Sequence, residues 1–346
     1  MADIYVPDTD WHEVGGTGEP SFENSWVNYS VAWSTAGFRI DAEGWVHLKG
    51  LVKSGTNGAT IFTLPEGYRP QTSSVGSEYT FAVGLNYGSA TVSYTTYIYI
   101  IPSTGEVRAF ANAGTPGTWT SLSGVQFPVA PRKKLDRRNI TDMSIDAPVV
   151  NEVPHAVRRR NGMVVFSGVS DVLDTTAVDP NLGDFSTGYS CMTPVRDNTA
   201  TTKRMDICRA RGILSVTTSP TDFGVFHTEW ALPETDYKWI TPSYSNSWVD
   251  FGIDVANNWE GARYFKDEFG YVHLRGLVKN GSAANATIFT LPSGYRPSHG
   301  KHEMFATLAN SALCRMDVLS TGQVQAATGG STTWTSLNGI HFHAGW

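Results

Sequence analysis

Apolar and β-branched residues in this chain come in short runs, and each run is bounded by turn-forming residues. Residues 45–52 read WVHLKGLV, which is too short to indicate a helix and rich in residues that pack on a pleated sheet. Acidic residues followed by glycine at 41–44 and 266–270 predict hairpin turns ahead of such runs. Residues 59–64 form another run, which Pro65 ends. The pattern predicts an all-β fold.

Much of this pattern occurs twice in the same order. Residues 44–53 (GWVHLKGLVK) return as 270–279 (GYVHLRGLVK), and 59–70 (ATIFTLPEGYRP) return as 286–297 (ATIFTLPSGYRP). The shorter strings NSWV at 24–27 and WTSL at 119–122 return at 246–249 and 334–337. Ordered matches over about 100 residues indicate one module used twice.

Short strands and turns within units of about 100 residues favour tandem antiparallel β-sandwich modules of jelly-roll type. The predicted domains are a first module at 1–130, a basic linker at 131–156, a divergent module at 157–235, and a copy of the first module at 236–346. The middle segment is a weaker third copy, because 162–168 (GMVVFSG) repeats the spacing of the glycines. The first copy carries an insertion around 88–99, where the two clear copies are expected to differ in what they contact.

Composition agrees with the predicted fold and excludes several functions. Charged residues make up 17% of the chain, below the usual value of about 25%, while glycine and aromatic residues are abundant. A net charge of −6 argues against binding to nucleic acid. No apolar run is long enough to cross a bilayer, and no secretory leader is visible at the start. Three cysteines are too few for a disulfide framework, so folding in a reducing cytoplasm is expected.

No catalytic motif of useful specificity is present, such as GxSxG, HExxH or CxxC, so no enzymatic activity and no cofactor are expected. Asp41 and Glu43, with Asp267 and Glu268 in the second copy, could form a carboxylate pair for glycosidic cleavage or bind calcium. Acidic residues in hairpin turns are ordinarily solvated, and that interpretation is favoured.

The histidines allow a metal site, although ordinary surface positions are favoured. His341 and His343 lie two apart on a predicted strand and point to the same face, where they could bind zinc or meet around a symmetry axis. His299 and His302 lie in a predicted loop. His47 and its copy His273 are expected to pack or to form hydrogen bonds inside the core.

Aromatic residues kept in both copies are expected to anchor the cores. The pairs are Trp26 and Trp248, Trp33 and Trp259, Trp45 and Tyr271, and Trp119 and Trp334. Unpaired tyrosines are the candidates for contact with a glycan or a partner, with packing in an oligomer as the alternative: Tyr87, Tyr94, Tyr97 and Tyr99. A basic cluster could dock on an acidic neighbour or an anionic polymer, or be a solvated linker: Arg132, Lys133, Lys134, Arg137, Arg138, Arg158, Arg159 and Arg160.

The repeated phrases, above all LPxGYRP, resemble a β-sandwich module of tailed bacteriophages. Such modules occur in minor tail proteins and in tail or head fibres, especially in phages of actinobacteria. The resemblance covers 22–127 and 244–343, and it covers the middle segment only loosely. It implies a virion component made in the host cytoplasm that contacts other virion proteins and host surface glycan, commonly as a homotrimer. It assigns no catalytic residues.

The leading expectation is therefore a minor tail or tail-fibre protein that binds a host receptor, without membrane insertion. A capsid fibre or decoration protein is the second interpretation. A carbohydrate-binding module or a polysaccharide depolymerase is the rival from another functional class.

Overall fold

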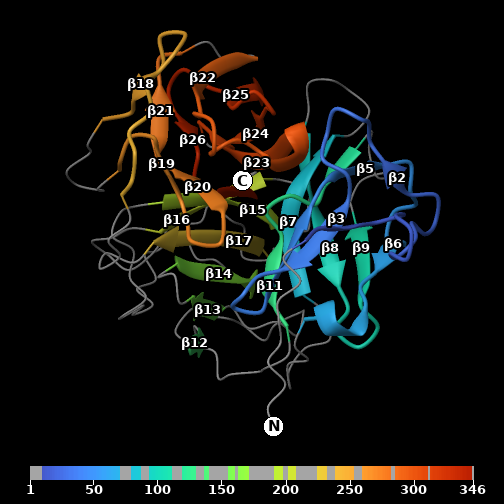
Figure 1. The fold of residues 1–346 in the computed structure, drawn as a ribbon. Coiled ribbons are helices and arrows are strands. Elements are labelled where there is room, and N and C mark those ends of the chain that lie inside the picture. Colours follow the sequence, from blue (N-terminus) through green and yellow to red (C-terminus); the bar gives the residue numbers. More distant parts are fainter. Residues whose placement is uncertain are drawn as a thin grey trace.

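The computed structural model describes fourteen stretches of the chain: residues 10–70, 79–86, 93–110, 119–129, 136–139, 155–159, 163–170, 191–197, 202–207, 224–231, 238–252, 259–281, 285–310 and 312–344. Strands in antiparallel sheets dominate these stretches, accompanied by short 3₁₀ turns such as Glu66–Tyr68 and Ser298–Gly300 (Figure 1). The predicted all-β class of sandwich modules is confirmed. In the described part of the chain, no helix has the length and apolar character needed to span a bilayer.

Module one, residues 10–129, consists of two sheets. The four-stranded sheet has the order β1 (His12–Glu13), β3 (Gly37–Ile40), β4 (Trp45–Lys49) and β11 (Gln126–Pro128). The seven-stranded sheet has the order β2 (Val27–Asn28), β5 (Leu51–Lys53), β10 (Trp119–Ser121), β7 (Tyr79–Asn86), β8 (Ser93–Ile100), β9 (Glu106–Phe110) and β6 (Thr60–Thr63).

Module three, residues 238–344, repeats this order. Its seven-stranded sheet runs β18 (Val249–Asp250), β21 (Leu277–Lys279), β26 (Thr335–Ser336), β23 (Glu303–Ala309), β24 (Ala312–Val318), β25 (Gln323–Thr328) and β22 (Ala286–Thr290). The other sheet runs β19 (Arg263–Lys266), β20 (Tyr271–Arg275) and β27 (Ile340–His343). A single bridge between Ile240 and Tyr264 replaces the pairing of β1 with β3.

Glycine allows the chain to pass from one sheet of the sandwich to the other. Gly50 separates β4 from β5 with a φ of +110°, and a Cβ there would lie 2.4 Å from the carbonyl oxygen of Thr35. Gly276 does the same between β20 and β21, with a φ of +98°. This close approach explains why the repeated sequence keeps a glycine in the middle of an apolar run.

The arginine of the LPxGYRP phrase fixes a loop by a hydrogen bond to the backbone in both modules. The Nε of Arg69 donates a hydrogen bond to the carbonyl oxygen of Leu64 at 3.1 Å, and Arg296 bonds Leu291 in the same way at the same distance. Tyr68 packs against the core of module one. The most specific part of the repeat therefore fixes a loop.

Of the eight aromatic residues kept in both copies, Trp26 and Trp248 lie in the two large apolar cores, as predicted, whereas Trp45 packs against Val165 and Tyr271 against His47 of module one. Seven of the eight are buried, and Trp33 is half-buried at the contact between modules. The deepest pair is Trp26 and Trp248, with 1% and 2% of their surface exposed. The ring of Trp26 lies against the turn after β5, and that of Trp248 lies against the turn after β21. A Cβ on Gly55 or Gly281 in these turns would overlap the ring.

All described strands of the middle segment join one six-stranded sheet, here called the middle sheet. Its order is β12 (Asp136–Asn139), β13 (His155–Arg158), β14 (Met163–Ser170), β17 (Gly224–Ala231), β15 (Cys191–Asp197) and β16 (Thr202–Ile207). The segment predicted as a basic linker thus contributes β12 and the start of β13. Strand β14 continues unbroken through Gly168, where modules one and three pass to their second sheet at Gly50 and Gly276.

The strand register of the middle sheet matches that of modules one and three. Arg158 pairs with Val164 as Ile40 pairs with Val46. One residue later, the amide of Arg159 donates to the carbonyl of Met163, which repeats the bond from Asp41 to Trp45. On the other side, β17 pairs with β14 as β11 pairs with β4 and β27 pairs with β20.

The register defines three sets of equivalent positions. They are Asp41, Arg159 and Asp267; His47, Val165 and His273; and Gln126, Glu229 and His341.

The three copies close into a ring around the centre of the molecule (Figure 1). Trp45, Met163 and Tyr271 stand at equivalent positions, and each packs against the next copy. Trp45 contacts Val165, Met163 contacts Phe265, and Tyr271 stacks on His47. The equivalent strands β7, β15 and β23 also contact one another. This is the arrangement of a cyclic trimer built within one chain.

The predicted insertion lies in the β7–β8 hairpin, which spans 79–100 where module three uses 303–318. Part of the hairpin faces the ring rather than solvent. A Cβ on Gly84 of β7 would lie 3.1 Å from the sulfur of Met304 in β23. The hydroxyl of Ser121 donates to the carbonyl of Met304 at 2.8 Å. Strands β7 and β10 thus help to join module one to module three, and β8, which carries part of the insertion, contacts β24.

Candidate functional site

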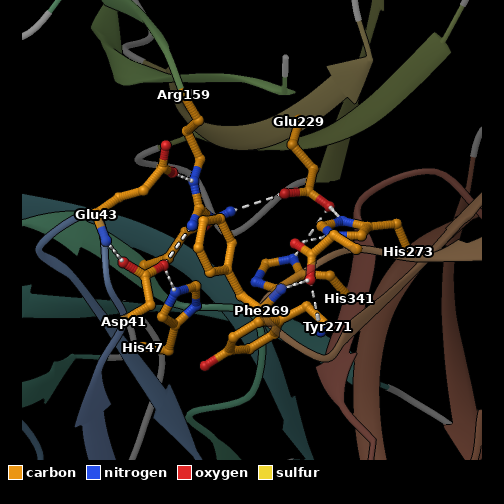
Figure 2. Close-up of polar contacts among 11 residues, drawn as sticks. Asp41, Glu43, His47, Arg159, Glu229, Phe269, Tyr271, His273 and His341 are labelled. Atoms are coloured by element: carbon orange, nitrogen blue, oxygen red, sulfur yellow. Dashed lines mark hydrogen bonds and ion pairs between the residues drawn. The ribbon is translucent and has the colours of Figure 1, made fainter. Parts of the chain in front are cut away.

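The main concentration of polar and titratable side chains in the described stretches is a buried cluster where the three copies meet, here called the junction (Figure 2). Its members are Asp41, Glu43, His47, Gln126, Arg159, Glu229, Asp267, Tyr271, His273 and His341.

Modules one and three contribute the same local motif to the junction. Asp41 follows β3, and its Oδ1 accepts hydrogen bonds from the amides of Glu43 and Trp45 at 2.9 and 3.0 Å. Its Oδ2 faces the Nε2 of His47 at 2.9 Å. Asp267 binds its own turn in the same way, and its Oδ2 lies 3.1 Å from the Nε2 of His273. The aspartate therefore fixes both a tight turn and a histidine on the next strand.

Arg159 occupies the aspartate position in the middle sheet and points into module one. Its guanidinium donates to Asp41, to Glu43 at 2.9 Å and to Gln126 at 3.1 Å. It also lies over the rings of Trp45 and Phe269, 5.2 and 5.7 Å from their centroids. Burial alone would lower the pKa of Arg159, but the charges of Asp41 and Glu43 raise it. The guanidinium is a cation shared by all three copies.

Glu229, from β17, links the middle sheet to both neighbours. One carboxylate oxygen lies 2.6 Å from the Nδ1 of His273, and the other accepts from the amide of Gln126 at 2.9 Å. Burial alone would raise the pKa of Glu229. The nearby rings of His341 and protonated His273, together with these bonds, bring that pKa well below its usual range.

The two duplicated histidines have opposite electrostatic surroundings. His273 lies between the carboxylates of Glu229 and Asp267, which outweigh burial and raise its pKa to about 9. His273 is therefore an imidazolium that donates from both nitrogens at neutral pH. His47 has one carboxylate partner, stacks on Tyr271 with ring centroids 4.1 Å apart, and faces Arg159. Burial lowers the pKa of His47 to about 4, so this ring is neutral.

The junction is closed to large molecules. Among its ion-paired residues, none exposes more than 6% of its side chain, so no substrate reaches these groups. The adjoining cavity between modules one and three has a volume of about 10 Å³, enough for about one water molecule. Its lining includes His47, Tyr271, Glu303, His341 and His343. The buried ion pairs of the junction therefore hold the three copies together.

Two predictions about the junction residues have clear outcomes. His47 and His273 form hydrogen bonds in the interior, as predicted. The interpretation of the turn acids as solvated is wrong for Asp41 and Asp267, which are 1% and 6% exposed. The carboxylate of Asp41 binds Arg159 of the middle sheet, and that of Asp267 binds His273 of its own module.

The metal alternative has no support in the described stretches, which contain no group of three histidine, cysteine or acidic side chains placed to hold an ion. His341 and His343 are buried in β27 and are not surface residues. His299 is exposed, and the Nδ1 of His302 accepts from the amide of Ser320 at 2.9 Å.

The tyrosine candidates are placed only in part. Tyr97 is 1% exposed and its ring packs at a tilt against that of Tyr99, so it does not reach a surface ligand. Tyr99 is half-buried against Phe110. Tyr94 lies on β8, but its side chain is outside the described part of the structure, as is all of Tyr87.

Of the predicted basic cluster, Arg159 is buried at 2% exposure and is not a surface docking residue. It does bind acidic neighbours, but these belong to its own chain. Arg137 and Arg138 lie on β12 and Arg158 lies on β13, with side chains outside the described part. Four members of the cluster fall outside the described residues altogether: Arg132, Lys133, Lys134 and Arg160.

Sequence reasoning missed Glu229 and Gln126, because neither has an identical counterpart in another copy. Aligning 159–165 with 41–47 on their shared glycine would have placed Arg159 opposite Asp41, which signals a charged contact between copies. No protein-family model, curated protein or solved structure matches this chain.

Proposed function

We propose that this chain is a non-catalytic structural protein of a bacteriophage virion, of the minor tail or tail-fibre type, which binds glycan on the host cell. One observation carries the proposal beyond the sequence resemblance. The residues best suited to chemistry, Asp41, His47, Arg159, Glu229 and His273, are buried and bind one another. That use of charge suits a scaffold, which leaves outer loops for recognition.

Repetition supports a binding role. Related copies closed into a ring present equivalent loops around a common axis, so weak sites on them add through avidity. The sequence favours a homotrimer of chains. The ring within one chain supports a different unit, in which a single chain supplies the threefold arrangement. Light scattering of the purified protein separates a 37.7 kDa monomer from a trimer.

The adsorption test concerns the connection at 87–92, which joins β7 to β8. Deleting the whole insertion would remove buried Tyr97 and Ile98 and disrupt the sheet, so substitutions such as Tyr87→Ala are the appropriate change. Purified wild-type protein should compete with phage for host cells. The Tyr87→Ala variant should compete less well while keeping the wild-type melting temperature. Equal competition by the variant and the wild type would show that this loop does not belong to the binding surface.

The position of the protein on the phage particle and its action on polysaccharide distinguish the alternatives. Antibody labelling at the tail supports the adsorption role, and labelling over the capsid supports a fibre or decoration protein. Incubation of the purified chain with host envelope polysaccharide tests the depolymerase alternative. Release of oligosaccharide by wild type but not by a heat-inactivated sample would overturn the non-catalytic assignment.

A further inference from the structure

We propose that acidification opens the ring of three copies at the junction, while the sandwich cores of modules one and three stay folded. The proposal concerns a conformational response of this chain and does not depend on the virion role.

The contact between modules one and three is rich in histidine. His47 of module one stacks on Tyr271 of module three and lies 6.3 Å from the ring of His341. His341 lies 6.0 Å from His273, and His343 packs edge-on against Tyr271 at 5.3 Å. These rings form a continuous layer between the two modules. Each added proton would place a new cation in this layer, beside others already there.

Charges from every copy face these rings. Asp41 of module one attracts a proton on His47, whereas Arg159 of the middle sheet and His341 of module three repel it. Around His341, Glu229 and Asp267 attract and His273 and Arg159 repel. Around His343, Asp267 attracts, whereas Arg39, His47 and His299 repel. The cations come from all three copies, so protonation strains the ring contact itself.

Burial dominates at all three rings. It lowers the pKa of His47 to about 4 and that of His343 to about 3, and it lowers the pKa of His341 as well. When the ring opens, these histidines return to a pKa near 6.5. A depressed histidine pKa stabilises the closed ring at neutral pH, and that stabilisation is lost as pH falls below 6.5. For His47 alone, whose pKa is about 4 in the closed ring, the closed-to-open equilibrium falls by about 160-fold by pH 4.

One group opposes opening. Glu303 accepts from the hydroxyls of Ser34 and Ser123 of module one at 2.5 Å, and Lys49 and Glu13 are its charged neighbours. Burial raises the pKa of Glu303, so its protonation favours the closed ring. Three histidines therefore act against one carboxyl group, and the net response to acid is opening.

The location of the histidines confines the response to the contact. His47 alternates along β4 with the core residues Val46 and Leu48, and His341 and His343 alternate along β27 with the core residues Ile340 and Phe342. Their rings therefore face away from the two large apolar cores. The small cavity beside His47, His341 and His343 gives a water molecule access to these rings. Acid thus acts on the surfaces that join the modules before it acts on their interiors.

The chain supplies its own substitutions for the test. Val165 stands at the position of His47 and Gln126 at the position of His341, so His47→Val and His341→Gln insert residues that the equivalent sites already hold. His299→Asn is the matched control, because His299 is exposed and asparagine tolerates its φ of +60°. Small-angle scattering at pH 8 checks that each variant starts closed.

The full-length chain is followed from pH 8 to pH 4.5 by radius of gyration, far-UV circular dichroism and acrylamide quenching of tryptophan. We expect the wild-type radius to rise below pH 6.5 with the dichroism unchanged. Acrylamide quenching should rise only in part, because Trp45 lies at a contact that opens, whereas Trp26 and Trp248 stay in the module cores. Each junction variant should shift the midpoint down by about half a pH unit. His299→Asn should shift it far less, because His299 has the smallest effect among the charges that repel a proton on His343.

Three results would overturn the proposal. One is a wild-type radius that stays constant to pH 4.5. Another is expansion that coincides with loss of dichroism, which indicates unfolding of the modules. The last is an unchanged midpoint in both junction variants. A variant already open at pH 8 is set aside, and the wild type and the other variant then decide.

Discussion

Replacing Arg159 tests whether buried charge holds the ring together. Arg159→Met keeps an unbranched side chain between Trp45 and Phe269 but removes the cation that Asp41 and Glu43 share. Removing one partner of a buried ion pair destabilises a protein by about 3–5 kcal/mol, because the remaining charge is left uncompensated. The lost contacts with the two rings add about 1 kcal/mol. We therefore expect a loss of about 5 kcal/mol.

Urea unfolding at pH 7.5, followed by tryptophan fluorescence, measures this loss. Arg108→Met is the matched control, because Arg108 is 38% exposed and its partner Glu106 is 25% exposed. An exposed pair contributes less than about 1 kcal/mol. Adding Asp41→Asn to Arg159→Met should recover about half of the loss, since asparagine keeps an acceptor for the turn and removes a buried charge. Equal effects of Arg159→Met and Arg108→Met would refute the reasoning.

The other predictions concern pH, a glycine and a core tryptophan. The pKa of His273 is raised to about 9, so its contribution to the free energy of unfolding is fully present below pH 6.5 and is lost as pH rises through 9. In urea titrations the wild type should lose about 3 kcal/mol of stability over that range, and His273→Gln should not. Gly50→Ala should destabilise the chain by about 1–3 kcal/mol in calorimetry, because its φ is positive and Thr35 blocks a Cβ, whereas Gly67→Ala, with open space around it, should be neutral. Trp26→Ala should destabilise module one by about 3–5 kcal/mol in urea unfolding, and a loss below 1 kcal/mol would contradict its place in the core.

Much of the fold follows from local pattern, and most of the junction does not. The duplicated runs around Trp45 and Tyr271, their glycines and their turns predict strands, because side-chain alternation and turn geometry are local properties. The duplication of Trp26 and Trp248 likewise predicts core positions.

Whether the turn acids are solvated or buried depends on a contact between segments that are distant in the sequence. Asp41 stands in an ordinary hairpin, and nothing near it in the sequence indicates that Arg159 will cover it. The sequence around Glu229 likewise gives no sign that this residue is buried, because its partners Gln126 and His273 lie in two other copies. Burial of these charges becomes visible only when the three strand registers are compared.

The protonation state of His273 is the most direct test of the junction. Its raised pKa requires Glu229 of the middle sheet to lie against module three, so it reports on contact between copies. The ring resonances are followed by NMR from pH 6 to pH 10 and assigned with His273→Gln. The closed ring predicts a midpoint near pH 9 that falls in Glu229→Gln. A midpoint near 6.5 in the wild type would contradict the three-copy ring.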